Sequence, residues 1–437
     1  MVVHDTTSFH VMAKPIGPIC NLDCAYCYYL HKRDLLRPSG TGSWRMSDHT
    51  LELFIRQYIE AQRTPYIQFA WQGGEPTLLG LAFFEKVIEL QRRYCPAGKT
   101  IQNALQTNGT LIDDQWAAFL KAHDFLVGIS IDGPREIHDR YRLDKAGRAS
   151  FDQVMRGRAC LVKHGVPHNA LVCINRDNGD KLREVYRFLR KERFQWIQFI
   201  PVVEPRDFET RGPGAQRPAF ENPEDAVTAW SVLPEQYGTF LITVFDQWVR
   251  QDIGQTFVQL FEECAAIWVG GQANLCIFQP TCGKAMAIEH DGTLFSCDHY
   301  VYPQYRLGNI HETHIGDLFG RPYQRQFGQQ KADALPGYCR QCEVRFACNG
   351  GCPKDRFMTT PDGERGLHYL CPAYKRFFKH VDPHMRTLAH LIRHGRPATD
   401  LSQIIRAQAR GLPKSAATKG RGARRTPRRR RRGSKSR

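Results

Sequence analysis

Short strand-like runs alternate with segments of helical periodicity from residue 9 to residue 200. The strand-like runs are rich in β-branched and aromatic residues and occupy 9–14, 66–71, 100–107, 125–132, 168–174 and 195–201. The helical segments between them are 47–62, 81–94, 113–123, 151–164 and 180–191. This alternation predicts a parallel sheet with crossover helices. Six units favour an α/β fold, a partial (β/α)6 TIM-like barrel, with an open sheet as the alternative. The chemistry of such folds lies at the carboxyl ends of the strands.

Composition changes along the rest of the chain and suggests five regions. Residues 204–227 are rich in proline, glycine and charge, which is typical of a linker or surface loop. We therefore expect a barrel over 1–230, a helical connection over 231–273, a cysteine-rich domain over 274–376, C-terminal helices over 377–411 and a disordered basic tail over 412–437.

Charge separates the tail from the body of the protein. The net charge is +17, and residues 414–437 contribute 12 lysines and arginines without an acid, which leaves +5 for the rest. The tail is predicted to be a solvated appendage, with contact to nucleic acid or another anionic surface as the alternative. No apolar run reaches the ~18 residues of a membrane span, and no secretory signal is apparent at the N-terminus. The sequence thus favours a cytoplasmic protein.

The first cysteines form a compact motif directly after the first strand. Cys20, Cys24 and Cys27 follow the spacing C-x3-C-x2-C, with Tyr26 before the last of them. Three thiolates in a short loop suit a metal cluster better than a disulfide. A cubane [4Fe-4S] cluster held by three thiolates leaves one iron open to another ligand. The alternative is a zinc site with His31 as its fourth ligand.

Further motifs follow the other predicted strands. Glycines allow the close approach of a ligand to the backbone, because no Cβ stands in the way. The segments are GGEP at 73–76, QTNG at 106–109, SIDGP at 130–134 and QFIPVV at 198–203.

Together, this cysteine motif and these segments resemble the radical S-adenosylmethionine (SAM) enzymes. In that family the open iron chelates the amino and carboxylate groups of SAM, and one electron cleaves SAM to methionine and a 5′-deoxyadenosyl radical. The resemblance implies that SAM is contacted by Tyr26, Gly74, Glu75, Ser130, Arg142 and Val203. An arginine suits the carboxylate because its planar fork donates two parallel hydrogen bonds.

Eight more cysteines lie between residues 276 and 371, enough for two complete sites of four thiolates each. Their spacing resembles the SPASM extension of radical SAM proteins, which carries two auxiliary [4Fe-4S] clusters. The resemblance pairs Cys276, Cys282, Cys297 and Cys352 at one cluster, and Cys339, Cys342, Cys348 and Cys371 at the other. Two zinc sites would satisfy the same number of ligands.

Asp298 directly follows the expected ligand Cys297. This Cys-Asp pair, with QGGEPTL, SIDGP and QFIPVVE, resembles the anaerobic sulfatase-maturating enzymes. Those enzymes oxidise one Cys or Ser in a C/S-x-P/A-x-R segment of an unfolded sulfatase to Cα-formylglycine. The resemblance implies that the radical takes a hydrogen atom from the substrate Cβ, that Asp298 takes the side-chain proton, and that an auxiliary cluster takes the remaining electron. A carboxylate could act in this way if burial near the clusters raised its pKa.

The resemblance also predicts the cofactors, an electron donor and a substrate pocket, and two alternative functions stay open. The resemblance implies SAM, three [4Fe-4S] clusters and an electron donor such as a flavodoxin or ferredoxin. It also implies a pocket with acidic residues for the substrate arginine. Another SPASM enzyme, one that makes thioether or carbon–carbon crosslinks in peptides, is the nearest alternative. A zinc-stapled nucleic-acid-binding protein is the alternative from a different class.

Overall fold

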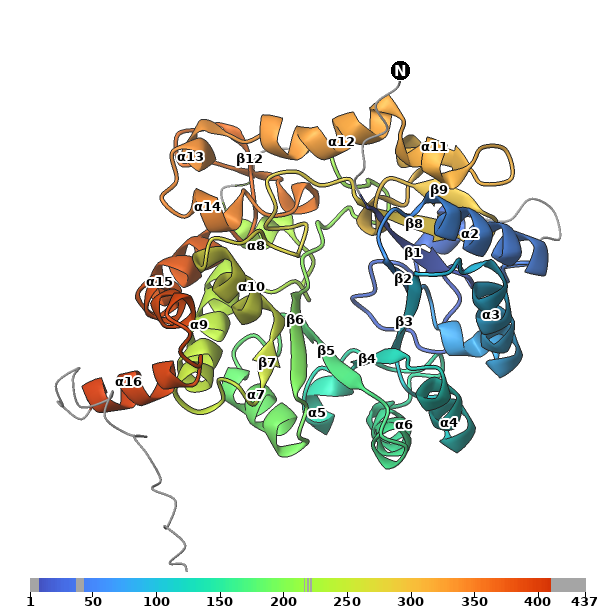
Figure 1. Cartoon of the computed structure of the whole chain (residues 1–437). Helices are drawn as coiled ribbons and strands as arrows, with labels where there is room; N and C mark the ends of the chain where they lie inside the picture. The colour runs from blue at the N-terminus through green and yellow to red at the C-terminus, as the bar shows by residue number, and fades with distance from the viewer. Residues whose placement is uncertain (1–7, 37–42, 216, 218–219, 221, 410–437) are drawn as a thin grey trace, which may run out of the picture.

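The computed structural model describes residues 8–36, 43–215, 217, 220 and 222–409 (Figure 1). The predicted basic tail over 412–437 lies outside these residues. No helix in the described ranges is both long enough and apolar enough to cross a membrane.

All six predicted strands form, at or within two residues of the expected ends. They pair in parallel and in sequence order, which is the order of a barrel wound in one direction. The strands are β1 (His10–Lys14), β2 (Tyr66–Trp71), β3 (Thr100–Thr107), β4 (Leu126–Ser130), β5 (His168–Ile174) and β6 (Trp196–Pro201), and β7 (Phe257–Val258) adds to β6. Figure 1 shows the sheet curving around, and in the described chain its two end strands, β7 and β10, do not pair with each other, so the barrel stays open. The prediction of a partial barrel is confirmed.

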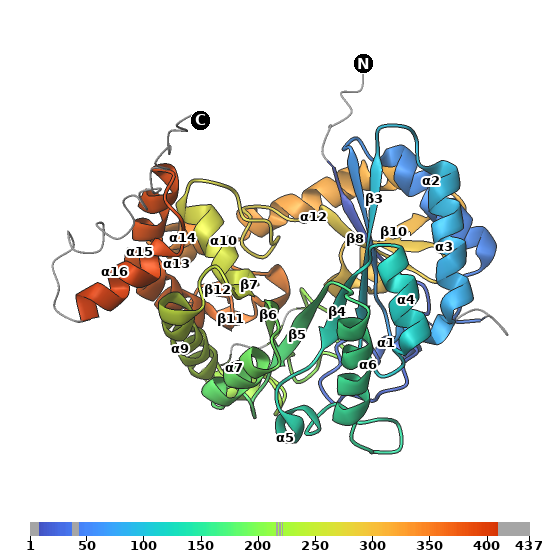
Figure 2. The ribbon, with the colours of Figure 1, turned by 60° about the horizontal axis from the view of Figure 1, so that its bottom comes forward.

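Helices cover the outer side of the curved sheet (Figure 2). The five predicted helices are α2 (Asp48–Ala61), α3 (Leu81–Tyr94), α4 (Asp114–Ala122), α6 (Phe151–Lys163) and α7 (Leu182–Lys191). Two of them begin at side-chain caps: the amide of Thr50 donates to Ser47 Oγ at 3.1 Å, and that of Trp116 to Asp113 Oδ1 at 2.8 Å. Short turns of helix are α1 (Lys32–Leu35), α5 (Arg135–His138) and α8 (Pro223–Ala226).

The cysteine-rich segment continues the sheet of the barrel. β8 (Ala285–Glu289) pairs in parallel with β1, and β9 (Thr293–Phe295) and β10 (Arg306–Asn309) follow as antiparallel strands. The remaining elements are α11 (Ile315–Phe319), α12 (Pro322–Asp333), α13 (Gly337–Arg340), α14 (Arg345–Cys348) and the hairpin β11 (Met358–Thr359) and β12 (Arg365–Leu367). The pairing of β8 with β1 joins the cysteine-rich segment directly to the first strand of the barrel.

Four further helices lie on the β7 side of the sheet (Figure 1). They are α9 (Pro234–Gln251), α10 (Gln259–Trp268), α15 (Cys371–Arg393) and α16 (Asp400–Ala409). α9 packs against α15 through aromatic rings, with Phe245 and Phe377 centred 6.1 Å apart. Since α15 begins at Cys371, the expected boundary between residues 376 and 377 falls inside one helix. The other domain boundaries stay predictions.

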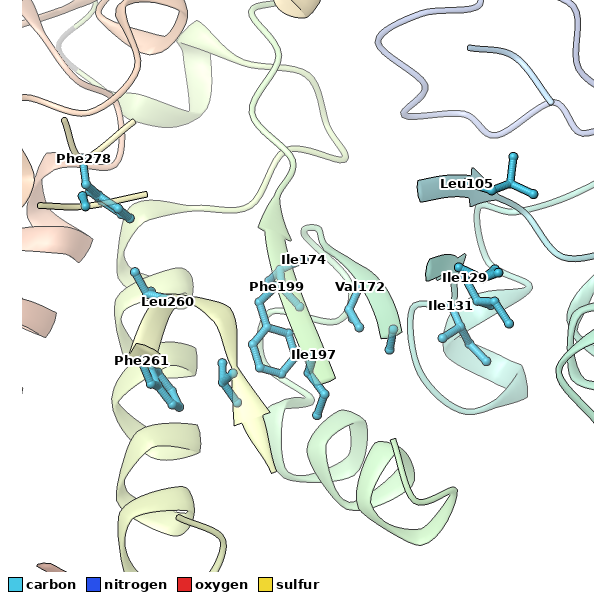
Figure 3. Packing of buried hydrophobic residues seen from close by; sticks show 14 of the residues in the cluster. Leu105, Ile129, Ile131, Val172, Ile174, Ile197, Phe199, Leu260, Phe261 and Phe278 are labelled. Atoms are coloured by element: carbon cyan, nitrogen blue, oxygen red, sulfur yellow. The ribbon is translucent and has the colours of Figure 1, made fainter. Parts of the chain in front are cut away.

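The core joins the sheet to these helices. Figure 3 shows buried side chains from β3 to β6, among them Leu105, Ile129, Val172 and Ile197, with Phe261 of α10 on the far side of β7. Burying each such side chain stabilises the fold by about 1.5–3 kcal/mol. The packed sheet fixes the strand ends from which the functional loops begin.

Candidate active site

The loop between β1 and α1 carries Cys20, Cys24 and Cys27. Its backbone is held against residues 141–143: the amide of Asp23 donates to the carbonyl of Leu143 at 2.8 Å and that of Ala25 to the carbonyl of Tyr141 at 3.2 Å. None of the three thiols forms a disulfide. Burial, with the nearby charges of Glu75 and Cys27, raises the pKa of Cys20 to about 12. Such thiols suit a bound metal, which stabilises the thiolate form.

Glu75, in the turn after β2, is buried and bound entirely within the protein. Its carboxylate accepts from the amide and hydroxyl of Thr77 at 3.0 and 2.6 Å. It also accepts from the hydroxyl of Thr107 at 2.8 Å and from the amide of Asn108 at 2.7 Å. The side chain therefore ties the end of β2 to the end of β3. Asn108 Nδ2 in turn lies 3.7 Å from the sulfur of Cys20.

Gly74 allows a close approach between two loops of the protein itself. Its amide and that of Glu75 donate to the carbonyls of Gly17 and Ile19, each at 2.8 Å. A Cβ on Gly74 would lie 1.9 Å from the carbonyl oxygen of Ile19. The space that glycine leaves is filled by the cysteine loop.

Replacing Gly74 by alanine is expected to separate these two loops. A Cβ cannot stand 1.9 Å from a backbone oxygen, so the cysteine loop must move, at a cost of about 1–3 kcal/mol by analogy with overpacked sites. Thermal unfolding and iron content after reconstitution measure the effect. Gly320→Ala is the control, since Gly320 has right-handed helical backbone and the nearest atom to its Cβ would lie at an ordinary contact distance of 3.4 Å. An unchanged unfolding midpoint and iron content for Gly74→Ala would contradict this account.

Arg142 is held by Asp132 in a buried, two-pronged ion pair. Nε and Nη2 of Arg142 lie 3.0 and 3.1 Å from the two carboxylate oxygens of Asp132. Asp132 also accepts from the hydroxyl of Tyr26 and, at 3.0 Å, from the amide of Cys173. One carboxylate thus connects the cysteine loop, the end of β4 and the end of β5.

The two other predicted SAM contacts also lie at strand ends. Ser130 is the half-buried last residue of β4. Val203 follows β6, is buried, and accepts a hydrogen bond at its carbonyl from Nζ of Lys354 at 2.7 Å. The six predicted SAM contacts therefore gather around the carboxyl ends of β1 to β6.

Asp298 lies where the end of β1 meets the turn after β9. Nζ of Lys14, the last residue of β1, is 2.5 Å from Asp298 Oδ1, and the hydroxyl of Tyr28 donates to Oδ2 at 2.7 Å. The Lys14 contact has the distance of an ion pair but not the angles of a hydrogen bond, so among the described residues Oδ1 has no hydrogen-bond partner. Oδ1 is therefore able to accept a proton.

The condition that the pKa of Asp298 be raised is not met. Burial acts in that direction, but the charges of Lys14 and His299 and the polar contacts with Lys14 and Tyr28 outweigh it. The pKa of Asp298 consequently lies below its ordinary value. The carboxylate is ionised at neutral pH.

The eight later thiols form two groups, and these are the groups that the sequence predicts. Burial is the main cause of the raised pKa of Cys297, and the charges of Cys352 and Cys276 raise it further. Burial and the charge of Cys276 likewise raise the pKa of Cys282. In the second group, Cys339, Cys342, Cys348 and Cys371 line a hollow of about 370 Å³ that is partly open to solvent. Ligation of clusters by these thiols stays a prediction.

No group of three or more Cys, His, Asp or Glu side chains in the described chain is arranged to hold a single metal ion. A cubane cluster offers a separate iron to each thiolate, so its ligands stand further apart than those of one ion.

A second cavity, of about 310 Å³ including the part open to solvent, lies between the barrel and the cysteine-rich segment. Glu204 is the one carboxylate among its described lining residues, whereas the sequence predicts several acids at the pocket. The lining residues are Tyr28, Lys32, Glu204, Pro205, Phe208, Arg211, Pro213, Arg217, His299, Tyr302 and Lys354.

Comparison with known proteins agrees with this geometry. Residues 15–189 match the Radical SAM superfamily, and residues 276–343 match SPASM, an iron-sulfur cluster-binding domain. A serine-type anaerobic sulfatase-maturating enzyme of Bacteroides thetaiotaomicron is 44% identical over 376 residues, which cover 86% of this chain and 90% of that protein. This chain belongs to the anaerobic sulfatase-maturating enzymes.

Other members of the family support the assignment. A cysteine-type anaerobic sulfatase-maturating enzyme of Clostridium perfringens is 32% identical and covers 88% of this chain and 99% of its own length. The solved structure of native anSMEcpe with bound AdoMet and Cp18Cys peptide matches with a TM-score of 0.77 at 31% identity, over 88% of this chain and 100% of that one. The predicted family is confirmed, and the iron-sulfur description favours clusters over zinc.

Sequence reasoning did not single out three residues of this chain that lie at the site: Lys14, Asp132 and Lys32. Lys14 and Asp132 each gave a signal, because each is a charged residue at the end of a buried strand pattern. Lys32 gave none, since nothing in the local sequence distinguishes it from a surface lysine.

Proposed function

We propose that this enzyme oxidises a Cys or Ser in a C/S-x-P/A-x-R segment of an unfolded sulfatase to Cα-formylglycine. Family membership supports the proposal. The observation that carries it is the position of Asp298. Its Oδ1 forms an ion pair with Lys14 but has no hydrogen-bond partner among the described residues, and its partner Tyr28 lines the cavity between the two parts of the protein.

Cys20, Cys24 and Cys27 would hold the [4Fe-4S] cluster with one open iron, and the two later groups of four cysteines would hold the auxiliary clusters. When bound, SAM and these clusters supply the radical that removes a hydrogen atom from the substrate Cβ and the acceptor for the electron that remains. Tyr26, Gly74, Ser130, Arg142 and Val203 would surround SAM. Glu75 would act by holding the backbone of its turn, because protein donors already occupy its carboxylate.

Asp298 would take the proton from the substrate Oγ or Sγ at its Oδ1. Lys14 and Tyr28 hold the carboxylate in place for this transfer. A serine side chain loses one hydrogen atom, one proton and one electron, which leaves the aldehyde. A cysteine side chain loses the same hydrogen atom, proton and electron and becomes a thioaldehyde. Water then hydrolyses the thioaldehyde to the aldehyde and releases hydrogen sulfide.

The remaining partners are proposed on chemical grounds. Cluster reduction calls for a low-potential donor such as a flavodoxin or ferredoxin. None of the fifteen cysteines forms a disulfide, which supports a reducing compartment and hence the cytoplasm. Contact of the tail with nucleic acid stays a prediction.

The test is the reaction itself. Anaerobically reconstituted protein is incubated with SAM, a reductant and a sulfatase peptide that carries Ser or Cys at the target. We expect loss of two hydrogen atoms from serine, or replacement of CH2SH by CHO in cysteine, as read by mass spectrometry. A crosslinking enzyme would join residues without forming an aldehyde. Cleavage of SAM with no change in either peptide would contradict the proposal, and zinc in place of iron would contradict the enzyme class.

A further inference from the structure

Lys32 is a buried lysine whose ammonium group has no hydrogen-bond acceptor among the described residues. It is the first residue of α1, five positions after Cys27, and only 1% of its surface is exposed. Aromatic rings surround it: Nζ lies 4.4 Å from the centre of the Tyr302 ring and 5.9 Å from that of Tyr28. Rings stabilise a cation but leave its hydrogen-bond donors unused.

Two other lysines near this site, Lys14 and Lys354, have acceptors. Lys14 meets Asp298 and Gln72, each at 2.5 Å. Lys354 donates to the carbonyl of Val203 and pairs with Glu204 and Asp355. A buried ammonium without an acceptor opposes folding, and burial accordingly lowers the pKa of Lys32 to about 8. This contrast indicates that Lys32 is retained for a group outside the protein.

The ammonium also lies at the right place to meet a substrate. Lys32, Tyr28, His299 and Tyr302 line the same cavity. Tyr28 donates to Asp298 at 2.7 Å, so one lining residue is bound directly to the carboxylate that would receive the substrate proton.

We propose that Lys32 binds a main-chain carbonyl oxygen of the substrate peptide beside the target residue and thereby fixes the position of the target Cβ. This inference rests on the proposed function. An ammonium group donates hydrogen bonds and accepts none, and carbonyl oxygens are acceptors that every peptide offers. The C/S-x-P/A-x-R segment requires no acidic residue that would compete for this place.

The decisive variant is Lys32→Met, which keeps the apolar stem and removes the charge. We expect it to weaken binding of a peptide with alanine at the target about tenfold or more, as for a lost charged hydrogen bond. It should raise the midpoint of thermal unfolding, because an unpaired buried charge is gone. Lys32→Arg should recover most of the binding. Lys86→Met, an exposed lysine on α3, should change neither quantity.

Peptides with a single thioamide identify the group that is bound. Sulfur accepts hydrogen bonds more weakly than oxygen, so a thioamide at the bound carbonyl should weaken binding to the wild type but not to Lys32→Met. The inference is overturned if Lys32→Met binds the peptide as the wild type does, or if only removal of a side-chain carboxylate reproduces its effect. A wild type that neither binds nor oxidises the sulfatase peptide would overturn the proposed function instead.

Discussion

Replacement of Asp298 by asparagine is expected to slow peptide oxidation by about 10²–10⁴-fold, the usual contribution of a positioned base. The amide keeps the shape of the side chain and its contact with Tyr28, but it cannot take a proton at Oδ1. SAM cleavage should continue, because Asp298 lies outside the predicted SAM contacts. The measurement is the ratio of formylglycine to 5′-deoxyadenosine, which should fall sharply.

Two controls separate proton transfer from a disturbed charge balance. Lys14 is fully buried, and removal of Asp298 leaves its ammonium group with Gln72 but without a counter-charge, which destabilises by about 3–5 kcal/mol. The double variant Lys14→Met, Asp298→Asn removes both charges and should recover stability but not oxidation. Asp291→Asn changes a turn aspartate of the same hairpin, which caps Thr293 at 2.9 Å, and should oxidise normally. Oxidation by Asp298→Asn within about tenfold of the wild-type rate would exclude the base role.

Replacement of Cys20, Cys24 and Cys27 together by alanine is expected to abolish SAM cleavage. Without these thiolates the open-iron cluster has no ligands, so iron should fall from about twelve to about eight atoms per chain. Retention of the remaining eight would show that the auxiliary groups still fold and assemble. Measurement of 5′-deoxyadenosine by chromatography and of iron by colorimetry gives both results.

Cys160→Ala is the matched control for this variant, since Cys160 lies on α6 and belongs to none of the three predicted groups of cluster ligands. It should keep its full iron content and the wild-type rate of cleavage. Formation of 5′-deoxyadenosine at the wild-type rate by the triple variant would overturn the assignment of the open iron to the first cysteine loop.

Local pattern was enough to predict the elements of the fold. Hydrophobic periodicity depends on residues a few positions apart, so β2, β3 and β5 have the predicted ends and α3 runs over the predicted residues. The cysteine spacing was informative in the same way, and the two groups of four thiols predicted by resemblance are gathered in space. The local pattern did not predict that β8 pairs with β1, because this pairing joins strands that are far apart in the sequence.

The partners of the site side chains were decided by the tertiary structure alone. Tyr28 and Asp298 are 270 positions apart, and Tyr26 and Asp132 are 106 apart. The sequence therefore determined which residue types stand at the strand ends, and hence the family and its chemistry. Only the folded chain decided that Lys14 lowers the pKa of Asp298 and that Asp132 holds Arg142. It also decided that Lys32 is buried with no hydrogen-bond acceptor in the part of the chain that the structure describes. Electrostatic effects depend on distance and burial in space, and neither is written in the local sequence.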